Sequence, residues 1–284
     1  MGYIYTQIAR FWETALLAAG SHLALSVGGI FFFGFPVAFS LGAYVFAILV
    51  GTGIGFWPAV FFAVFMSAGV GLVYALLYGK LSNDSFAVFT LASVLALDAL
   101  IRSWDSMTGG VLGIANIVRP AWVHTFLDLI LLQGAVAAAV LIIEYFFLRS
   151  PFGRALQAHK EDKILLEASG VSSFRVGSVV LVLSVIFSAC AGILAAWRIR
   201  FIDPTFGGIP ILLQIVTISI LAFTPKVRWL AGSTLFVVLL PEVLRFFNFS
   251  STVVGPMRLL VYSVMLIFLV KRMATSYTLQ KRQV

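Results

Sequence analysis

Few residues of this 284-residue chain could carry out proton or metal chemistry. The three histidines (His22, His124 and His159) are far apart, and Cys190 is the single cysteine, so neither a shared metal site nor an intrachain disulfide is predicted. The sequence contains no H-E-x-x-H pair and no G-x-x-x-x-G-K-[ST] phosphate loop. We therefore expect structural or interfacial histidines, no catalytic residue, no metal site and no ATPase site within the chain.

Asp98 and Glu144 are acidic residues within apolar stretches, where an ionisable group is costly and usually faces the bundle interior or a cavity. Asp98 could line a solute pathway. Alternatively, Arg102 lies four residues further on and could form a structural ion pair with it near the outer surface, which is the favoured interpretation. Glu144 is close to Arg149, and we expect it to snorkel to the membrane interface.

A second candidate pathway region follows Asp98 in the sequence. Thr108, Gly109 and Gly110 come after an apolar stretch that begins near Phe86 and Thr90. Glycines let a small polar solute approach the backbone, and the ends of broken helices suit the charges of a zwitterion. A tight outer turn is an equally good interpretation of the same residues.

The elements that position these residues must be membrane-spanning helices. The chain is 61% hydrophobic and 11% charged, against roughly 25% charged for a soluble domain. Its apolar runs are continuous rather than alternating, which excludes a β-barrel. We expect an all-α integral membrane protein, one transmembrane domain over residues 1–284 with about eight or nine helices. The expected spans are 12–33, 35–50, 56–79, 85–102, 124–148, 177–197, 208–224, 229–247 and 256–271.

Glycines and proline predict a broken or re-entrant element near 28–36, because they interrupt helices and such breaks persist where protein surrounds them. Small residues at four-residue spacing predict close helix packing instead. They are Ser188, Gly192 and Ala196, and also Gly51 and Gly55.

Residues 149–176 form the one long polar stretch. Its basic residues place it in the cytoplasm by the positive-inside rule. Helix-favouring residues predict a short amphipathic helix over 155–168, which Gly170 could end in a left-handed conformation. Such a helix suits docking on a cytosolic partner, although a solvated connection is an equal alternative from physics alone.

The net charge of +8 does not indicate nucleic-acid binding, because the basic residues lie at the ends of apolar runs rather than in a stripe with aromatic residues.

The polar stretch resembles the corresponding loop of the branched-chain amino-acid ABC permease family. Residues 150–163 (SPFGRALQAHKEDK) and 168–171 (ASGV) are similar to its S-x-x-G-R-A-x-x-A-x-R-E-D-E and A-x-x-x-G-I elements. The resemblance covers almost the whole chain and is closer to the M-type subunit than to its H-type companion. Further matching segments are 34–44, 86–92, 108–114, 191–196, Asp203-Pro204 and Pro241-Glu242.

The resemblance implies a permease subunit of an ATP-driven importer in a bacterial plasma (inner) membrane, crossing it several times. Its partners would be cytosolic ATP-binding subunits, a second permease (an H-type sister or another copy) and an extracytoplasmic solute-binding protein. ATP and Mg would be bound by the ATPase subunits, and this chain would hold no cofactor. The coupling contacts would come from Arg154, Glu161, Asp162, Glu167 and Gly170.

The solute implied by the resemblance is a branched-chain or other hydrophobic amino acid, or a small amide or urea-like compound. Two departures bear on this inference. Leu95 stands where the family commonly has a carboxylate, and Phe223 to Trp229 replaces its glycine-rich G-G-x-G-S turn. An ion-gradient-driven secondary transporter remains the alternative, with Asp98 as its candidate titrating group. A membrane scaffold without transport is disfavoured.

Overall fold

The computed structural model describes residues 2–117, 119, 123, 125–245, 255–257, 259–268 and 271. Up to residue 245, these residues form eleven α-helices, one π-helix, two 3-10 helices and a two-stranded antiparallel sheet. The α-helices are α1 Gly2–Ser21, α2 Phe35–Gly51, α3 Phe56–Tyr78, α4 Asn83–Ser103, α5 Asp105–Thr108, α6 Phe126–Arg149, α7 Pro151–Glu161, α8 Lys163–Ala168, α9 Ser173–Ile199, α10 Ile209–Leu221 and α11 Val227–Arg245. The short elements are the π-helix η1 His22–Val27, the 3-10 helices η2 Gly110–Leu112 and η3 Pro204–Gly207, and strands β1 Ile114–Ala115 and β2 Phe201–Ile202.

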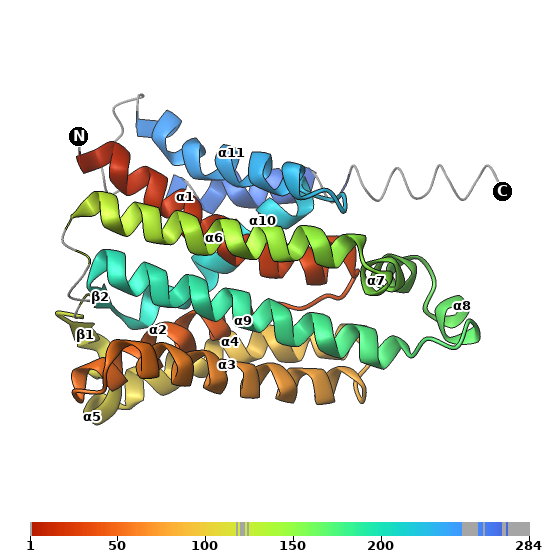
Figure 1. The fold of residues 1–284 in the computed structure, drawn as a ribbon, viewed down its shortest axis with the longest axis horizontal. Coiled ribbons are helices and arrows are strands. Elements are labelled where there is room, and N and C mark those ends of the chain that lie inside the picture. Colours follow the sequence, from red (N-terminus) through yellow and green to blue (C-terminus); the bar gives the residue numbers. More distant parts are fainter. Residues whose placement is uncertain are drawn as a thin grey trace.

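The long helices lie side by side in an elongated bundle (Figure 1). The small sheet and α5 lie at one end of this bundle, which we call the strand end. α7 and α8 lie at the opposite end, which we call the α7–α8 end. The two ends therefore carry the chain's irregular and polar elements, as expected when the sides face lipid.

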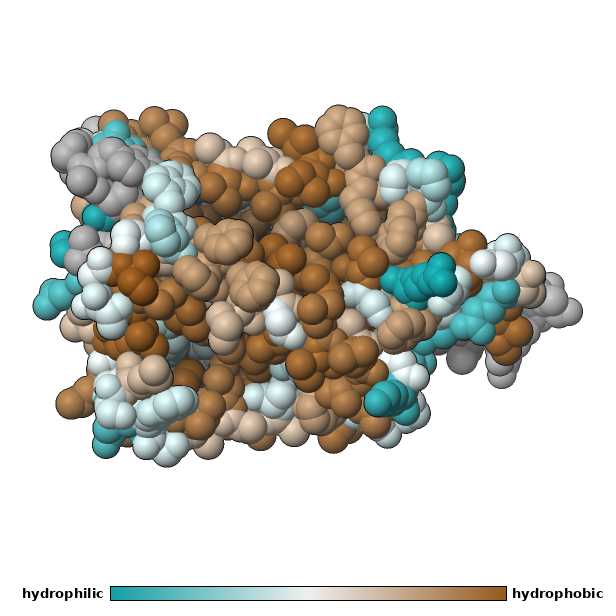
Figure 2. Space-filling view, turned by 60° about the horizontal axis from the view of Figure 1, so that its bottom comes forward, coloured by the Kyte–Doolittle hydropathy of each residue, from teal (hydrophilic) through white to brown (hydrophobic). Residues whose placement is uncertain are grey.

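Five helical segments are long and apolar enough to cross a membrane: α3, α4, α6, α9 and the η3–α10 stretch Pro204–Leu221. They match five of the nine predicted spans to within a few residues. The predicted span 177–197 begins inside α9, which starts at Ser173, and the predicted span 208–224 extends beyond Leu221, where α10 ends. The predicted span 256–271 lies partly outside the described residues. Figure 2 shows apolar side chains over the side of the bundle and hydrophilic ones gathered towards both ends. The all-helical membrane fold is confirmed, and the larger count of eight or nine crossings stays a prediction.

α9 is the central helix, and small residues allow its close contact with α1 and α2. A Cβ atom on Gly192 would collide with the backbone carbonyl oxygen of Phe39, and one on Gly42 would meet the backbone of Ala189. Ser188 and Ala196 are buried in the same face of α9. The predicted packing role of this series is therefore confirmed.

The packing role predicted for Gly51 and Gly55 is wrong. Gly51 ends α2 and has no neighbouring atom within 4 Å, while Gly55 precedes α3 and meets only the ring of Pro58. Between them, Gly53 adopts a φ of +87°, a conformation that glycine takes without steric cost. These glycines make a turn between two helices, which spacing alone does not distinguish from a packing motif.

A break separates the first two helices, as the sequence predicts. α1 continues as η1, the chain is non-helical over residues 28–34, and α2 begins at Phe35 with Pro36 in its first turn. Gly29 has a φ of +63°. In Figure 1, α1 runs from the strand end towards the α7–α8 end, and α2 runs back. The break therefore reverses the chain inside the bundle.

The close packing of α9 on α2 yields a first prediction. Gly192→Ala should destabilise the protein by about 1–3 kcal/mol, because the added methyl group overpacks the helix contact. Gly69→Ala is the matched control, since Gly69 is also helical but has no atom within 4 Å of its Cβ position. The measurement is the thermal unfolding midpoint of both purified variants in detergent. Equal midpoints for the two variants would contradict the proposed contact.

Candidate functional site

The first candidate site is the segment from Ser150 to Gly170, and its local structure follows from capping side chains. The Ser150 hydroxyl accepts a hydrogen bond from the Gly153 amide at 3.2 Å, and Pro151 occupies the first turn of α7. Asp162 has an extended backbone, and its carboxylate accepts hydrogen bonds from the amides of Ile164 and Leu165 at 2.8 and 3.1 Å.

The single helix predicted over 155–168 is therefore wrong. Asp162 ends α7 and caps α8, so the segment is two short helices with a bend between them. Gly170 has the left-handed conformation that the sequence predicts, with a φ of +85°. The cap explains the bend. The Asp162 carboxylate accepts hydrogen bonds from the first amides of α8, which in a continuous helix would pair with backbone carbonyl groups of the preceding turn.

The inner face of α7 is fastened to the break between α1 and α2. His159 donates from Nδ1 to the carbonyl oxygen of Gly28 at 3.0 Å, and Lys160 donates from Nζ to the carbonyl oxygen of Ser26 at 2.7 Å. The fully buried Leu156 packs so closely on Gly28 that a Cβ atom there would lie 2.9 Å from its methyl group. Carbonyl groups freed by the broken helix are thus paired with side chains of α7.

A hydrogen-bonded chain fastens the same segment to the end of α3 and the start of α4. Lys163 donates from Nζ to the Tyr78 hydroxyl at 3.1 Å and to the Asn83 side-chain oxygen at 2.9 Å. The Tyr78 hydroxyl in turn shares a hydrogen bond of 2.8 Å with Nε2 of His159, whose Nδ1 carries the proton given to Gly28. A lowered pKa favours the neutral form of His159, in which Nε2 accepts from the Tyr78 hydroxyl. Burial lowers the pKa of His159 and outweighs the Gly28 hydrogen bond, which raises it; the charge of Lys163 lowers it further.

The outer face of the segment has a different character. Ile164 and Leu165 on α8 are 81% and 70% exposed, although both are large apolar residues. The predicted coupling residues Arg154, Glu161, Asp162, Glu167 and Gly170 are all exposed around them. A segment attached to the bundle on one face and exposing apolar and acidic side chains on the other is suited to binding a partner.

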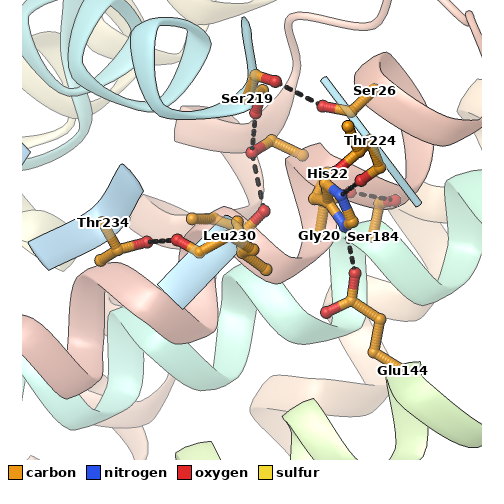
Figure 3. A network of polar contacts seen from close by, with 11 residues as sticks. Gly20, His22, Ser26, Glu144, Ser184, Ser219, Thr224, Leu230 and Thr234 are labelled. Carbon is orange, nitrogen blue, oxygen red and sulfur yellow. Dashed lines mark hydrogen bonds and ion pairs between the residues drawn. The ribbon is translucent and has the colours of Figure 1, made fainter. Parts of the chain in front are cut away.

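The second candidate site is a buried polar network centred on η1 (Figure 3). His22 and Glu144 are both fully buried, and Nδ1 of His22 lies 2.5 Å from Oε1 of Glu144. Nε2 of His22 lies 2.8 Å from the carbonyl oxygen of Thr224. These contacts join η1, α6 and the connection between α10 and α11.

The interfacial position predicted for Glu144 is therefore wrong. The face of α6 that carries Glu144 turns towards α1 and away from Arg149, which stacks on the ring of Tyr145 at 4.3 Å instead. His22 is structural, as expected, and buried rather than interfacial; His159 is likewise buried and structural. His124 lies outside the described residues.

Hydroxyl groups extend the network around the π-helix. Ser21 and Ser219 share a hydrogen bond of 2.6 Å between their hydroxyls, and Ser26 donates to the carbonyl oxygen of Ser219 at 2.6 Å. Ser184 of α9 donates to the carbonyl oxygen of Gly20 at 2.7 Å. Single π-helical turns occur frequently at functional sites, and a histidine inside an apolar run was the only sequence signal for this one.

A cavity of about 210 Å³ lies between α1, α2, α9, η3 and α10, near the strand end. Its charged side is formed by Arg10, Glu13 and Arg198. Nε of Arg198 donates to both carboxylate oxygens of Glu13, at 2.8 and 3.0 Å. Gln133 also donates to Glu13, at 2.8 Å. The apolar side of the cavity includes Leu17, Phe39, Phe206, Ile211 and Ile215. Sequence reasoning missed this site, because Glu13 precedes a long apolar run and its partner is 185 residues away.

The residues predicted for a solute pathway fall into three places, and none of them lines this cavity. Phe86 and Thr90 lie together against the break, where Thr90 accepts a hydrogen bond from the Phe33 amide at 3.1 Å and Phe86 stacks on Phe32. Asp98 forms the partly exposed ion pair with Arg102, at 2.8 and 3.2 Å, that the sequence favours.

The third place is the turn after α5. The Thr108 hydroxyl lies 2.7 Å from the carbonyl oxygens of both Ile101 and Trp104, and Gly109 and Gly110 have φ values of +71° and +56°. This geometry is that of the tight turn considered as the alternative interpretation. A direct contact of these residues with solute stays a prediction.

These features define a helical membrane protein in which two short helices at one end of the bundle, α7 and α8, lie against a break between α1 and α2, and side chains of α7 hydrogen-bond to its carbonyl groups. Residues 3–270 match the family described as the branched-chain amino acid transport system permease component, and the chain belongs to this family. The resemblance drawn from the sequence is thereby confirmed. Its members are permease components, so the expectation that the chain is not an enzyme is also confirmed.

Two curated relatives are the high-affinity branched-chain amino acid transport system permease protein LivM of Escherichia coli (strain K12) and that of Salmonella typhimurium. Each is 28% identical to this chain, and the match covers 72% of this chain and 55% of the relative. The chain thus spans about half the length of these relatives. PsaBC from Streptococcus pneumoniae, solved in complex with Fab, has a similar fold, with a TM-score of 0.51 at 16% identity, covering 93% of this chain and 89% of that one.

The buried His22–Glu144 pair yields a second prediction. Glu144→Leu alone should destabilise the protein by about 3–5 kcal/mol, because it leaves a buried polar partner uncompensated. The double variant His22→Leu/Glu144→Leu should lose less than the sum of the two single variants. The measurement is a double-mutant cycle on unfolding in detergent.

Asp98→Leu and Arg102→Leu provide the matched cycle on an exposed ion pair, with an expected coupling of about 0.3–0.5 kcal/mol. Additive losses at His22 and Glu144 would show that the two side chains do not interact.

The neutral state of His159 yields a third prediction. Since its pKa in the folded protein is below the ordinary value of 6.5, its contribution to stability is fully present above that value and is lost as the pH falls below it. The wild type should therefore lose more thermal stability on acidification than His159→Gln. A variant with the same pH dependence as the wild type would exclude His159 as the source.

Proposed function

We propose that this chain is the permease subunit of an ATP-driven ABC importer and forms half of a pathway for a small solute. The observation that carries the proposal is that the α7–α8 segment is attached to the helix break on one side and exposed to a partner on the other. Its inner face is hydrogen-bonded to the break between α1 and α2, while the adjoining α8 exposes Ile164 and Leu165. Family membership supports the same function.

The geometry suggests how partner movement would reach the pathway. A displacement of α8 moves α7, whose His159 and Lys160 hold the carbonyl groups of Gly28 and Ser26. The far side of the break is held by Thr90 through the Phe33 amide. A movement of α7 would thus be applied directly to the break, without passing through a long helix.

The proposed solute is a branched-chain or other hydrophobic amino acid, with a small amide or urea-like compound as the less favoured class. The LivM relatives are named for branched-chain amino acid transport. The cavity at the strand end has a charged side and an apolar side, as an amphiphilic solute requires. The departures at Leu95 and at 223–229 leave the choice within this class to experiment.

In the proposed assembly, the α7–α8 end faces the bacterial cytoplasm and binds ATPase subunits, which hold ATP and Mg. A solute-binding protein delivers solute to the strand end, and a second permease, of the H-type or another copy, completes the pathway. Arg154, Glu161, Asp162, Glu167 and Gly170 are the proposed contact residues, because all are exposed near Ile164 and Leu165.

The exposed apolar pair gives the fourth prediction. Ile164→Ser/Leu165→Ser should abolish co-purification of ATPase subunits from native membranes while leaving the bundle folded, because neither side chain packs on it. Glu161→Lys should weaken the association through its reversed charge.

Val111→Ser/Leu112→Ser is the control and should keep the ATPase subunits, because this exposed apolar pair lies at the strand end. At Asp162 itself, Asp162→Asn tests the charge alone, since an asparagine side chain still caps α8. Asp162→Lys would be uninformative because it removes this cap. ATPase subunits that remain bound to the double variant would disprove the contact. Intact wild-type protein without any ATPase partner would favour a gradient-driven transporter.

A further inference from the structure

A second cavity, of about 420 Å³, lies where α6 ends and α11 begins. It is on the bundle's α7–α8 end, since Arg149 is the last residue of α6 and α7 follows at Pro151. Its lining residues come from α6, α7, the connection between α10 and α11, and the first turn of α11. They are Tyr145, Leu148, Arg149, Gln157, Pro225, Lys226, Val227 and Arg228.

This cavity is strongly basic. Arg149, Lys226 and Arg228 line it, and no acidic residue does so among the described residues. Arg154 adds a fourth cation nearby, because its guanidinium donates to the carbonyl oxygen of Arg149 at 3.3 Å. The acid next to Tyr145 in the sequence, Glu144, is buried on the opposite face of α6 against His22.

The cations of the connection are also uncompensated. Lys226 and Arg228 are exposed, and their side chains make no hydrogen bond or ion pair with any residue that the structure describes. Arg149 is held in place by stacking on Tyr145 rather than by a carboxylate. Three positive charges thus surround one cavity without an anionic partner among the residues that the structure describes.

The position of the cavity matches the boundary between hydrocarbon and water. Arg149 ends a helix long and apolar enough to span a membrane. About one to two turns further into that span, α6 exposes Ile142, Ile143 and Phe146, and the exposed Trp229 follows Arg228 on α11. Apolar side chains on the lipid side and aromatic residues at headgroup depth are typical of a membrane interface.

We propose that this cavity binds the phosphodiester headgroup of an anionic phospholipid, with its acyl chains along the exposed apolar face of α6. Basic pockets between transmembrane helices bind such headgroups, and three cations with one amide side chain supply the required donors. The site does not depend on the transported solute or on the ATPase subunits.

The test compares lipid binding to the purified full chain in detergent, using phosphatidylglycerol and phosphatidylcholine with the same acyl chains. Native mass spectrometry measures affinity, and the thermal midpoint measures stabilisation. The wild type should bind phosphatidylglycerol in preference to phosphatidylcholine. Lys226→Gln/Arg228→Gln should weaken phosphatidylglycerol binding roughly thirtyfold (about 2 kcal/mol).

Lys80→Gln/Arg175→Gln is the charge-matched control, because it removes two exposed cations from the same end of the bundle but outside the cavity. This control should keep the lipid preference. Arg149→Gln, made separately, should also weaken binding, so that the result does not depend on the folding of one variant.

Three outcomes would overturn the proposal. The first is an unchanged phosphatidylglycerol preference in Lys226→Gln/Arg228→Gln. The second is equal stabilisation by inorganic phosphate, which would assign the cavity to a free anion. The third is a variant that keeps the lipid preference but loses ATPase subunits from native membranes, which would assign the basic surface to a protein partner.

Discussion

The structure depends on how one break in a membrane helix satisfies its backbone hydrogen bonds. Lipid offers no hydrogen-bonding partner, so a non-helical segment inside a bundle must be paired with protein groups. At the end of η1 and in the segment before α2, the carbonyl groups of Ser26 and Gly28 accept from Lys160 and His159, and the Phe33 amide donates to Thr90. The break is therefore stable only while α7 and α4 stay against it. This requirement makes α7 part of the bundle's interior structure, although it lies at the edge of the bundle.

The same constraint explains why polar side chains gather around η1. A π-helical turn displaces the regular hydrogen-bond pattern, and nearby hydroxyl groups of Ser26 and Ser184 pair with carbonyl groups of α10 and α1. A buried histidine and glutamate can stay in this region because each is the other's partner. The polar network and the fastened break are neighbours, so the bundle between α1 and α7 is held by directional bonds as well as by apolar packing. Such bonds have discrete geometries, which suits a region that must adopt two defined arrangements.

Sequence reasoning succeeded where the signal is local and failed where the partner is distant. Continuous apolar runs predict the helices, glycines and Pro36 predict the break, and the i,i+4 spacing predicts the Asp98–Arg102 pair. In contrast, Glu144 lies near Arg149 in the sequence but pairs with His22, 122 residues away. Glu13 and Arg198 are similarly remote. The bend at Asp162 was missed for a different reason. An aspartate between two helix-forming stretches can either continue the first helix or cap the second. The choice depends on tertiary packing, here the burial of Leu156 on α7 and Leu166 on α8.

The connection between α10 and α11 links features that would otherwise look independent. The carbonyl group of Thr224 pairs with His22, the ring of Phe223 lies 3.5 Å from Nζ of Lys160, and Lys226 and Arg228 line the basic cavity. One short segment therefore contacts the buried pair, the helix that closes the break, and the membrane interface. A glycine-rich turn could supply the carbonyl group but not the aromatic ring or the cations. The connection thus lies between the break and the proposed lipid site, so a change in lipid occupancy would reach the break through Phe223 on Lys160 and through Thr224 on His22.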